Sequence, residues 1–253
     1  NNPGCMGWQP PDFRRLVPCD DRLGRSLGIN NIPPKSCSYS CVYCQVGPTR
    51  EREIEPRGFY SPETILSDVE ERLDALEQAG EQVDYLTFVP DGEPTLDANL
   101  GKTIALLRPL GVRIAVISNA SLLWRPEVRE RLVDVDWLSV KIDSVDEDIW
   151  RRINRPHQDL RLEMILDGIR EIGNHFRGEL HTETMLVEGV NDRLGEFELE
   201  GALEIEYRSP RDGPSEGPKS ANGSRCSSPS GTITSRATPS GRASISKEDH
   251  VRP

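Results

Sequence analysis

The sequence contains no run of apolar residues that approaches the roughly 20 needed to cross a bilayer as a helix. Only 35% of its 253 residues are hydrophobic, and 6% are aromatic. The start at Asn1 offers neither the basic stretch nor the apolar stretch of a secretory leader. We therefore expect a cytoplasmic protein that does not associate with a membrane.

The sequence also has fewer basic than acidic residues, with 31 Lys and Arg against 42 Asp and Glu, which gives a net charge of −11. Residues 207–253 hold 8 of the basic and 4 of the acidic residues, so residues 1–206 carry a net charge of −15. An acidic body repels phosphate backbones unless a local basic patch overrides the repulsion. The composition disfavours a general nucleic-acid binder.

Apolar residues are scarce towards the C-terminus. Of the 47 residues in 207–253, 22 are Ser, Gly or Pro and 8 are hydrophobic. Such a stretch cannot bury a core. We expect a folded domain over residues 1–206 and a disordered tail over 207–253, which is either natural or the product of a reading-frame change.

Helical and strand patterns alternate along the folded part. A helix is expected to begin after Ser61, with Pro62 at its first position, and to end at Gly80. Strands are predicted at 27–32, 83–89, 112–117, 137–142 and 179–187, and the stretch at 83–89 is a short, dense apolar run. Further helices are expected at 96–107, at 126–133, around 165–176 and, more weakly, at 194–205. This alternation predicts an α/β fold with parallel strands that curve into a full or partial barrel, with its chemistry at the C-terminal strand ends.

Three of the six cysteines, Cys37, Cys41 and Cys44, lie within eight residues after the first expected strand. Three thiolates in a CxxxCxxC spacing can hold three irons of a cubane cluster and leave the fourth iron open to a small molecule. The alternatives are a structural zinc site, which usually needs a fourth ligand, and unliganded core cysteines. Cys5 and Cys19 are too few and too far apart to hold a second cluster.

This cysteine spacing, with Tyr43 before the last cysteine, resembles the signature of the radical SAM superfamily. The sequence RLGRSLGIN at 22–30 and the sequence DGEPT at 91–95 extend the similarity to stand-alone radical SAM proteins related to wyosine-type tRNA-modifying enzymes. The similarity spans about residues 15–195. It implies a partial (β/α)6 TIM-like barrel, although the family's sixth strand is not evident before the Ser-rich tail.

The resemblance also implies an activity. In the family, a [4Fe-4S] cluster reductively cleaves S-adenosylmethionine to methionine and a 5′-deoxyadenosyl radical, which abstracts hydrogen from a substrate. An oxidoreductase-like enzyme of this kind needs an external electron donor of the flavodoxin or ferredoxin type. The substrate class stays open between a tRNA base, a protein and a small metabolite. The alternative is a non-catalytic iron–sulfur or zinc-binding module with an incomplete barrel.

The resemblance assigns cofactor contacts to the second and third strand ends. Gly92, Glu93 and Pro94 correspond to the motif that binds the methionine amino group, and Tyr43 lies beside the cluster. The same residues could instead form an ordinary Asp-Gly turn followed by a proline. Ser118 and Asn119 are implied to contact S-adenosylmethionine, with a Ser or Asx turn as the alternative.

Lys141 and Asp143 end the fourth expected strand on one face. They are candidate catalytic residues that could bind cofactor or substrate or donate a proton, or else an ion pair that fills the interior. Arg151 and Arg152, followed by residues 154–157, form the one concentrated basic segment, a candidate for binding an anionic substrate. The alternative, which we prefer, is a solvated loop paired with the acidic residues at 146–148.

Overall fold

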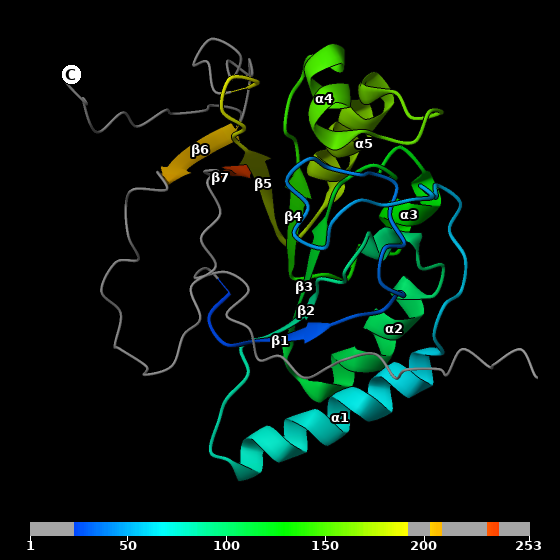
Figure 1. Ribbon diagram of the computed structural model, residues 1–253. Helices are drawn as coiled ribbons and strands as arrows, with labels where there is room; N and C mark the ends of the chain where they lie inside the picture. Colours follow the sequence, from blue (N-terminus) through cyan, green and yellow to red (C-terminus); the bar gives the residue numbers. More distant parts are fainter. Residues whose placement is uncertain (1–22, 192–202, 209–231, 238–253) are drawn as a thin grey trace, which may run out of the picture.

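The computed structural model describes residues 23–191, 203–208 and 232–237. Its centre is a seven-stranded sheet in the order β1-β2-β3-β4-β5-β7-β6 (Figure 1). Five strands are parallel and follow chain order: β1 (Ser26–Ile29), β2 (Tyr85–Phe88), β3 (Arg113–Ser118), β4 (Trp137–Lys141) and β5 (Glu179–Met185). These strands confirm the predicted α/β class and are consistent with a partial barrel.

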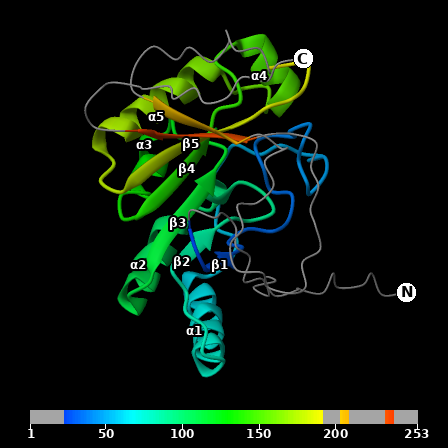
Figure 2. The same ribbon diagram turned by 90° about the vertical axis from the view of Figure 1, so that its left-hand side faces the viewer.

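Helices connect the parallel strands. They are α1 (Pro62–Gln78), α2 (Leu100–Leu107), α3 (Pro126–Glu130), α4 (Glu147–Asn154) and α5 (Leu162–His175). Figure 2 shows α2, α3 and α5 on one side of the sheet and the segment that follows β1 on the other. Both faces of the parallel strands are therefore covered, which explains why all four residues of β2 are buried.

Helix α1 begins and ends as its sequence predicts. The Ser61 hydroxyl accepts a hydrogen bond from the backbone N–H of Thr64 at 3.1 Å, and Pro62 needs no such partner. Its apolar stripe buries Ile65 and Val69 in the main core. The helix is followed by Gly80 at φ 73°, a left-handed conformation that glycine adopts without strain.

Three expectations about helices need correction. The helix predicted at 96–107 begins only at Leu100, because a 3-10 turn (Pro94–Leu96) precedes it. The basic segment is not a loop, since α4 contains its first residues and is capped by Asp146, whose side chain accepts two backbone N–H groups. The helix predicted at 194–205 is wrong at its end, where β6 (Leu203–Arg208) begins, and its residues 194–202 lie outside the described part.

The edge of the sheet beyond β5 also departs from the expected barrel. There β7 (Thr232–Ala237) pairs antiparallel with β5, and β6 pairs antiparallel with β7. Strand β7 lies within the tail that we expected to be disordered, and its sequence, TITSRA, is locally rich in β-branched residues. The division of the chain at residue 206 stays a prediction, because most of the tail lies outside the described residues.

Among the residues that the structure describes, no helix is both long enough and apolar enough to cross a bilayer.

Two glycines of α5 provide a matched test of its packing. A Cβ atom on Gly168 would lie 2.4 Å from backbone atoms of Leu123 and Trp124, whereas one on Gly173 would meet nothing closer than 3.7 Å. We expect Gly168→Ala to lower the free energy of unfolding by about 1 to 3 kcal/mol through overpacking. Gly173→Ala should raise it by about 0.5 to 1 kcal/mol, since alanine is the better helix former. Urea unfolding of both variants measures the difference. Equal effects would contradict the close packing of α5 against the backbone of Leu123 and Trp124.

Candidate functional site

The three clustered cysteines lie on a loop that is fastened to α4. The backbone N–H of Cys44 donates to the carbonyl of Cys41 at 3.1 Å, which closes a turn within the loop. The N–H groups of Ser40 and Val42 donate to carbonyl oxygens of the last two residues of α4 at 3.0 and 2.8 Å. All three cysteines are free and partly exposed. The chain thus presents three thiols on a loop that the fold holds in place.

Burial favours the neutral form of two of these thiols. Burial, with a further contribution from Glu93, raises the pKa of the Cys37 thiol to about 12. Burial also raises the pKa of the Cys41 thiol to about 11, although a hydrogen bond from Asn154 acts in the opposite direction. A metal that binds here has to displace both protons, so metal uptake at these thiols releases acid.

Glu93 lies beyond the end of β2, where it caps the 3-10 turn, and it is 1% exposed. Its Oε1 accepts hydrogen bonds from the hydroxyls of Thr95 and Ser118 at 2.6 and 2.7 Å, and from the N–H of Thr95 at 3.1 Å. Its Oε2 accepts the backbone N–H of Asn119 at 2.7 Å. Burial raises the pKa of the Glu93 carboxyl, while these donors lower it. Glu93 therefore joins the ends of β2 and β3.

Asn119 continues this connection to the cysteine loop. Its Nδ2 donates to the hydroxyl of Ser38 at 2.9 Å and to the sulfur of Cys37 at 3.5 Å. Its Oδ1 accepts the N–H of Ser121 at 3.0 Å, in an Asx turn. The alternative of a local turn is therefore present at Asn119, together with a contact to one of the thiols.

Gly92 marks a close approach between the β2 end and the cysteine loop. A Cβ atom at this position would lie 2.1 Å from the carbonyl oxygen of Ser36. The same oxygen accepts the backbone N–H of Glu93 at 2.9 Å. Pro94 is buried at the start of the 3-10 turn. Only glycine fits at residue 92, which supports a specific arrangement rather than an ordinary exposed turn.

Asp143 lies beyond the end of β4 and is 2% exposed. Its Oδ2 accepts the hydroxyl of Tyr43 and, at 2.5 Å, the side-chain N–H of Asn154. Its Oδ1 accepts the backbone N–H of Met185 at 2.8 Å. The ammonium group of Lys141 lies 4.9 Å from the centroid of the Tyr43 ring. Lys141 and Asp143 thus both contact the cysteine loop through Tyr43, and no hydrogen bond or ion pair joins them to each other within the described residues.

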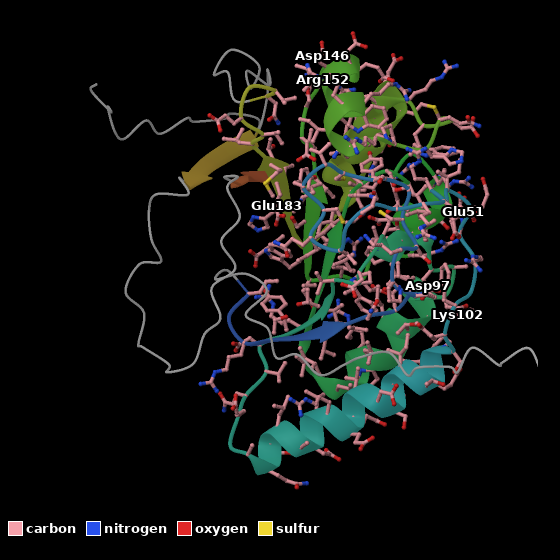
Figure 3. The ribbon with its side chains drawn as sticks, viewed as in Figure 1. Glu51, Asp97, Lys102, Asp146, Arg152 and Glu183 are labelled. Atoms are coloured by element: carbon pink, nitrogen blue, oxygen red, sulfur yellow. The ribbon has the colours of Figure 1, made fainter. Side chains whose placement is uncertain are left out.

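The basic segment is only partly available for a ligand. Arg151 forms an ion pair with Glu147 at 2.7 Å, as the alternative of pairing with upstream acids predicts. The backbone N–H of His157 donates to the Ser38 carbonyl at 2.9 Å, so this residue supports the cysteine loop. Arg152 is exposed on α4 near Asp146, at the top of the view in Figure 3.

Two asparagines contact this site in ways that the sequence did not predict: Asn154, which the sequence placed only in the basic segment, and Asn191, which it placed only in the loop after the fifth strand. Asn154 is 2% exposed and contacts Asp143, Tyr43 and Cys41 through its side-chain nitrogen. Asn191 is 1% exposed and donates to the backbone carbonyls of Asp143 and Met185 at 2.7 and 2.9 Å. Their one sequence signal is an asparagine beside a strand end or a helix end, which is too common to identify a site.

The donor set fits ligation of an iron–sulfur cluster. In such a cluster each thiolate binds a different iron, so three thiols on one loop need not converge on a single point. A structural zinc ion needs about four converging donors. Within the described residues, no group of three or more His, Cys, Asp or Glu side chains is placed to hold a single metal ion. Side-chain N–H groups that donate to Cys37 and Cys41 are also the kind of partner that sulfur ligands take.

Asp97 makes the unfolding free energy of the metal-free protein depend on pH. This carboxyl lies between the 3-10 turn and α2, and burial raises its pKa from 3.8 to about 6 (Figure 3). The folded state therefore binds this proton more tightly than the unfolded state does. The resulting contribution to stability is fully present below pH 4 and is lost as the pH rises through 6. The difference corresponds to about 3 kcal/mol of unfolding free energy for the metal-free protein. Urea unfolding between pH 4 and 7.5 should show a steeper loss in wild type than in Asp97→Asn, and parallel curves would contradict the assignment.

Known proteins are similar to this chain in sequence. The model of the Radical SAM superfamily matches residues 31–197. A UPF0026 protein of Methanocaldococcus jannaschii is 56% identical over 169 residues, which cover 67% of this chain and 52% of that protein. An S-adenosylmethionine-dependent nucleotide dehydratase of Lacinutrix mariniflava is 31% identical over 138 residues, which cover 52% of this chain and 28% of that protein. The chain spans about half the length, or less, of these relatives.

A solved structure shows the same fold. A radical SAM methyltransferase from Sphaerobacter thermophilus superposes with a TM-score of 0.51 and 15% identity, covering 67% of this chain and 50% of that chain. The family match spans β2 to β5, the cysteine loop, and both strand ends described above. This chain belongs to the radical SAM superfamily.

Proposed function

We propose that the protein is an enzyme that uses S-adenosylmethionine as the source of a radical. The observation that carries the proposal is the loop with three free thiols, held against the ends of β2, β3 and α4 within the family match. Cys37, Cys41 and Cys44 would hold a [4Fe-4S] cluster. When bound, the cluster supplies the electron that breaks the sulfur–C5′ bond of S-adenosylmethionine, giving methionine and the 5′-deoxyadenosyl radical that abstracts hydrogen from a substrate.

The chain's own residues would orient the cofactor. Gly92 lets the backbone of the β2 end pass close to the cysteine loop, and Glu93 fixes that end to Ser118 and Asn119. Pro94 and Tyr43 would line the same site. Lys141 offers a cation beside the Tyr43 ring, suited to an anionic group of cofactor or substrate. Asp143 would act chiefly by orienting Tyr43 and Asn154, because both of its carboxylate oxygens already accept hydrogen bonds.

The proposal includes a partner and a compartment. The electron would come from a one-electron carrier of the flavodoxin or ferredoxin type. Reducing conditions, as in the cytoplasm, would keep the three thiols available. The substrate would be a tRNA base, a protein or a small metabolite.

The test is reductive cleavage of S-adenosylmethionine. The protein is reconstituted anaerobically with iron and sulfide, reduced with dithionite and mixed with S-adenosylmethionine, and 5′-deoxyadenosine is measured by mass spectrometry. We expect product from wild type and none from Cys41→Ala. Equal product from both proteins, or none from a wild type with a full cluster, would refute the proposal.

The second candidate is a non-catalytic iron–sulfur module. The antiparallel strand β7 occupies the edge of β5 where a barrel of the family would place its next parallel strand. A protein that takes up iron and sulfide yet forms no 5′-deoxyadenosine would support this candidate.

A further inference from the structure

Asn154 is buried at the end of α4, next to the cysteine loop, and no role follows for it from the proposed reaction. Its side-chain nitrogen lies 2.5 Å from Asp143 Oδ2, 3.4 Å from the sulfur of Cys41 and 3.4 Å from the hydroxyl oxygen of Tyr43. Its side-chain oxygen is buried and has no hydrogen-bond partner. The amide is therefore positioned through its nitrogen alone.

The neighbouring carboxylate fixes which way this amide faces. An ionised carboxylate oxygen can only accept hydrogen bonds, so the atom next to Asp143 Oδ2 has to be the amide nitrogen. The amide nitrogen has two hydrogens. One serves Asp143, and the other is directed to Cys41 and Tyr43 on the cysteine loop. The Tyr43 hydroxyl also donates to Asp143, so both side chains are held by the same carboxylate.

The backbone of Asn154 is fixed as well. Its carbonyl oxygen accepts the N–H of Ser40 at 3.0 Å, one residue before Cys41. The next residue, Arg155, adopts a left-handed conformation at φ 44°, which ends α4 at this point. Main chain and side chain thus hold Asn154 against the loop from two directions. A buried amide that leaves its own oxygen unpaired in order to keep this orientation calls for an explanation.

We propose that Asn154 is a positioning residue that donates a hydrogen bond to the Cys41 sulfur and thereby makes the ligated cluster easier to reduce. The inference rests on the proposed function, since it requires Cys41 to be a cluster ligand. The Cys41 sulfur carries more negative charge when the group it ligates is reduced, and a hydrogen bond to a charged acceptor is stronger than one to a neutral acceptor. The N–H group therefore stabilises the reduced state more than the oxidised state.

Asp143 has a separate part in this arrangement. Its carboxylate orients the amide but also adds negative charge near the thiols, as its raising effect on the pKa of Cys41 indicates. Replacing Asp143 would change both influences at once. The clean test therefore changes Asn154 and leaves Asp143 in place.

The test uses Asn154→Leu, which has a similar volume and no N–H group, with Asn154→Ala as a second variant that avoids steric strain. Asn174→Leu is the matched control, because Asn174 is exposed on α5. Each protein is reconstituted anaerobically, its iron and sulfide are counted, and its midpoint potential is measured by redox titration monitored by electron paramagnetic resonance. Electron–nuclear double resonance in D2O then reports exchangeable protons coupled to the reduced cluster.

We expect both Asn154 variants to take up iron and sulfide but to have a more negative midpoint potential. A tenfold weaker equilibrium for one-electron reduction corresponds to a shift of about 59 mV. One exchangeable-proton coupling should disappear in the same variants, and Asn174→Leu should behave as wild type. A purely structural role for Asn154 would not remove that coupling.

Unchanged potentials and an unchanged coupling in both Asn154 variants would overturn the inference. Loss of iron uptake in both variants, with normal uptake by wild type, would also overturn it in favour of a structural role. A wild type that takes up no iron refutes the proposed function and the inference together. A wild type that takes up a full cluster but cleaves no S-adenosylmethionine refutes the proposed function alone, and the potentials then still decide the role of Asn154.

Discussion

Gly92→Ala should reduce the formation of 5′-deoxyadenosine by about 100-fold, the loss that a misplacement of about 1 Å can cause at a reacting centre. A Cβ atom at residue 92 would lie 2.1 Å from the Ser36 carbonyl oxygen and 2.9 Å from the Ile32 side chain. Neither contact can persist, and the first involves backbone that cannot rotate away. Ser36 directly precedes Cys37, so the displacement passes to the first thiol of the loop.

The same substitution should also lower stability. Overpacking at a closely packed position typically costs about 1 to 3 kcal/mol of unfolding free energy. Urea unfolding of the metal-free protein and counting of bound iron measure the two effects separately. Gly173→Ala is the control, because its added methyl group would make only an ordinary van der Waals contact, 3.7 Å from the Leu180 side chain. Normal iron content and normal 5′-deoxyadenosine formation in Gly92→Ala would contradict the close approach that we describe.

The sequence predicts most of the fold because its elements carry strong local signals. Helix α1 combines Ser61, Pro62 and Gly80 at its two ends, and its apolar residues recur at helical spacing. Strands β2, β3 and β4 are short, largely apolar runs between polar loops. Helix α4 lacks such a pattern, because it has eight residues and its buried apolar side chains are Trp150 and Ile153 alone. Its strongest signal is the cap formed by Asp146, which we interpreted as part of a solvated loop.

The candidate site is predicted only as far as its residues carry a motif. The cysteine spacing and residues 91–95 are recognisable in the sequence by themselves. Asn154 and Asn191 acquire a role only when the fold brings α4 and the end of β5 next to Asp143. The interpretation of Glu93 also depends on the fold. In the sequence, its carboxylate indicates a group that is able to bind an ammonium group. The structure surrounds this carboxylate with four donors of the chain itself.

Those four donors make Glu93→Gln the second substitution with a large expected effect. Glutamine has the same shape but one acceptor oxygen, so its NH2 group would face either the N–H of Asn119 or the donors of Thr95 and Ser118. A buried donor left without an acceptor costs about 1 to 3 kcal/mol. Removing the charge also removes the desolvation that raises the Glu93 pKa. The loss expected for Glu93→Gln therefore comes from geometry and not from the missing charge, because the NH2 group of glutamine would face buried donors that then lack an acceptor.

We therefore expect Glu93→Gln to be destabilised by about 1 to 3 kcal/mol relative to wild type. If the carboxylate also helps to hold the ammonium group of S-adenosylmethionine, losing one charge-assisted bond weakens binding by about 10- to 100-fold. Equilibrium binding of S-adenosylmethionine to the reconstituted protein and urea unfolding of the metal-free protein measure these effects independently. Glu71→Gln, at an exposed position of α1, is the control and should change neither quantity. A destabilised Glu93→Gln that binds S-adenosylmethionine as tightly as wild type would limit Glu93 to joining β2 to β3. A variant with unchanged stability would mean that the four hydrogen bonds do not hold the strand ends together.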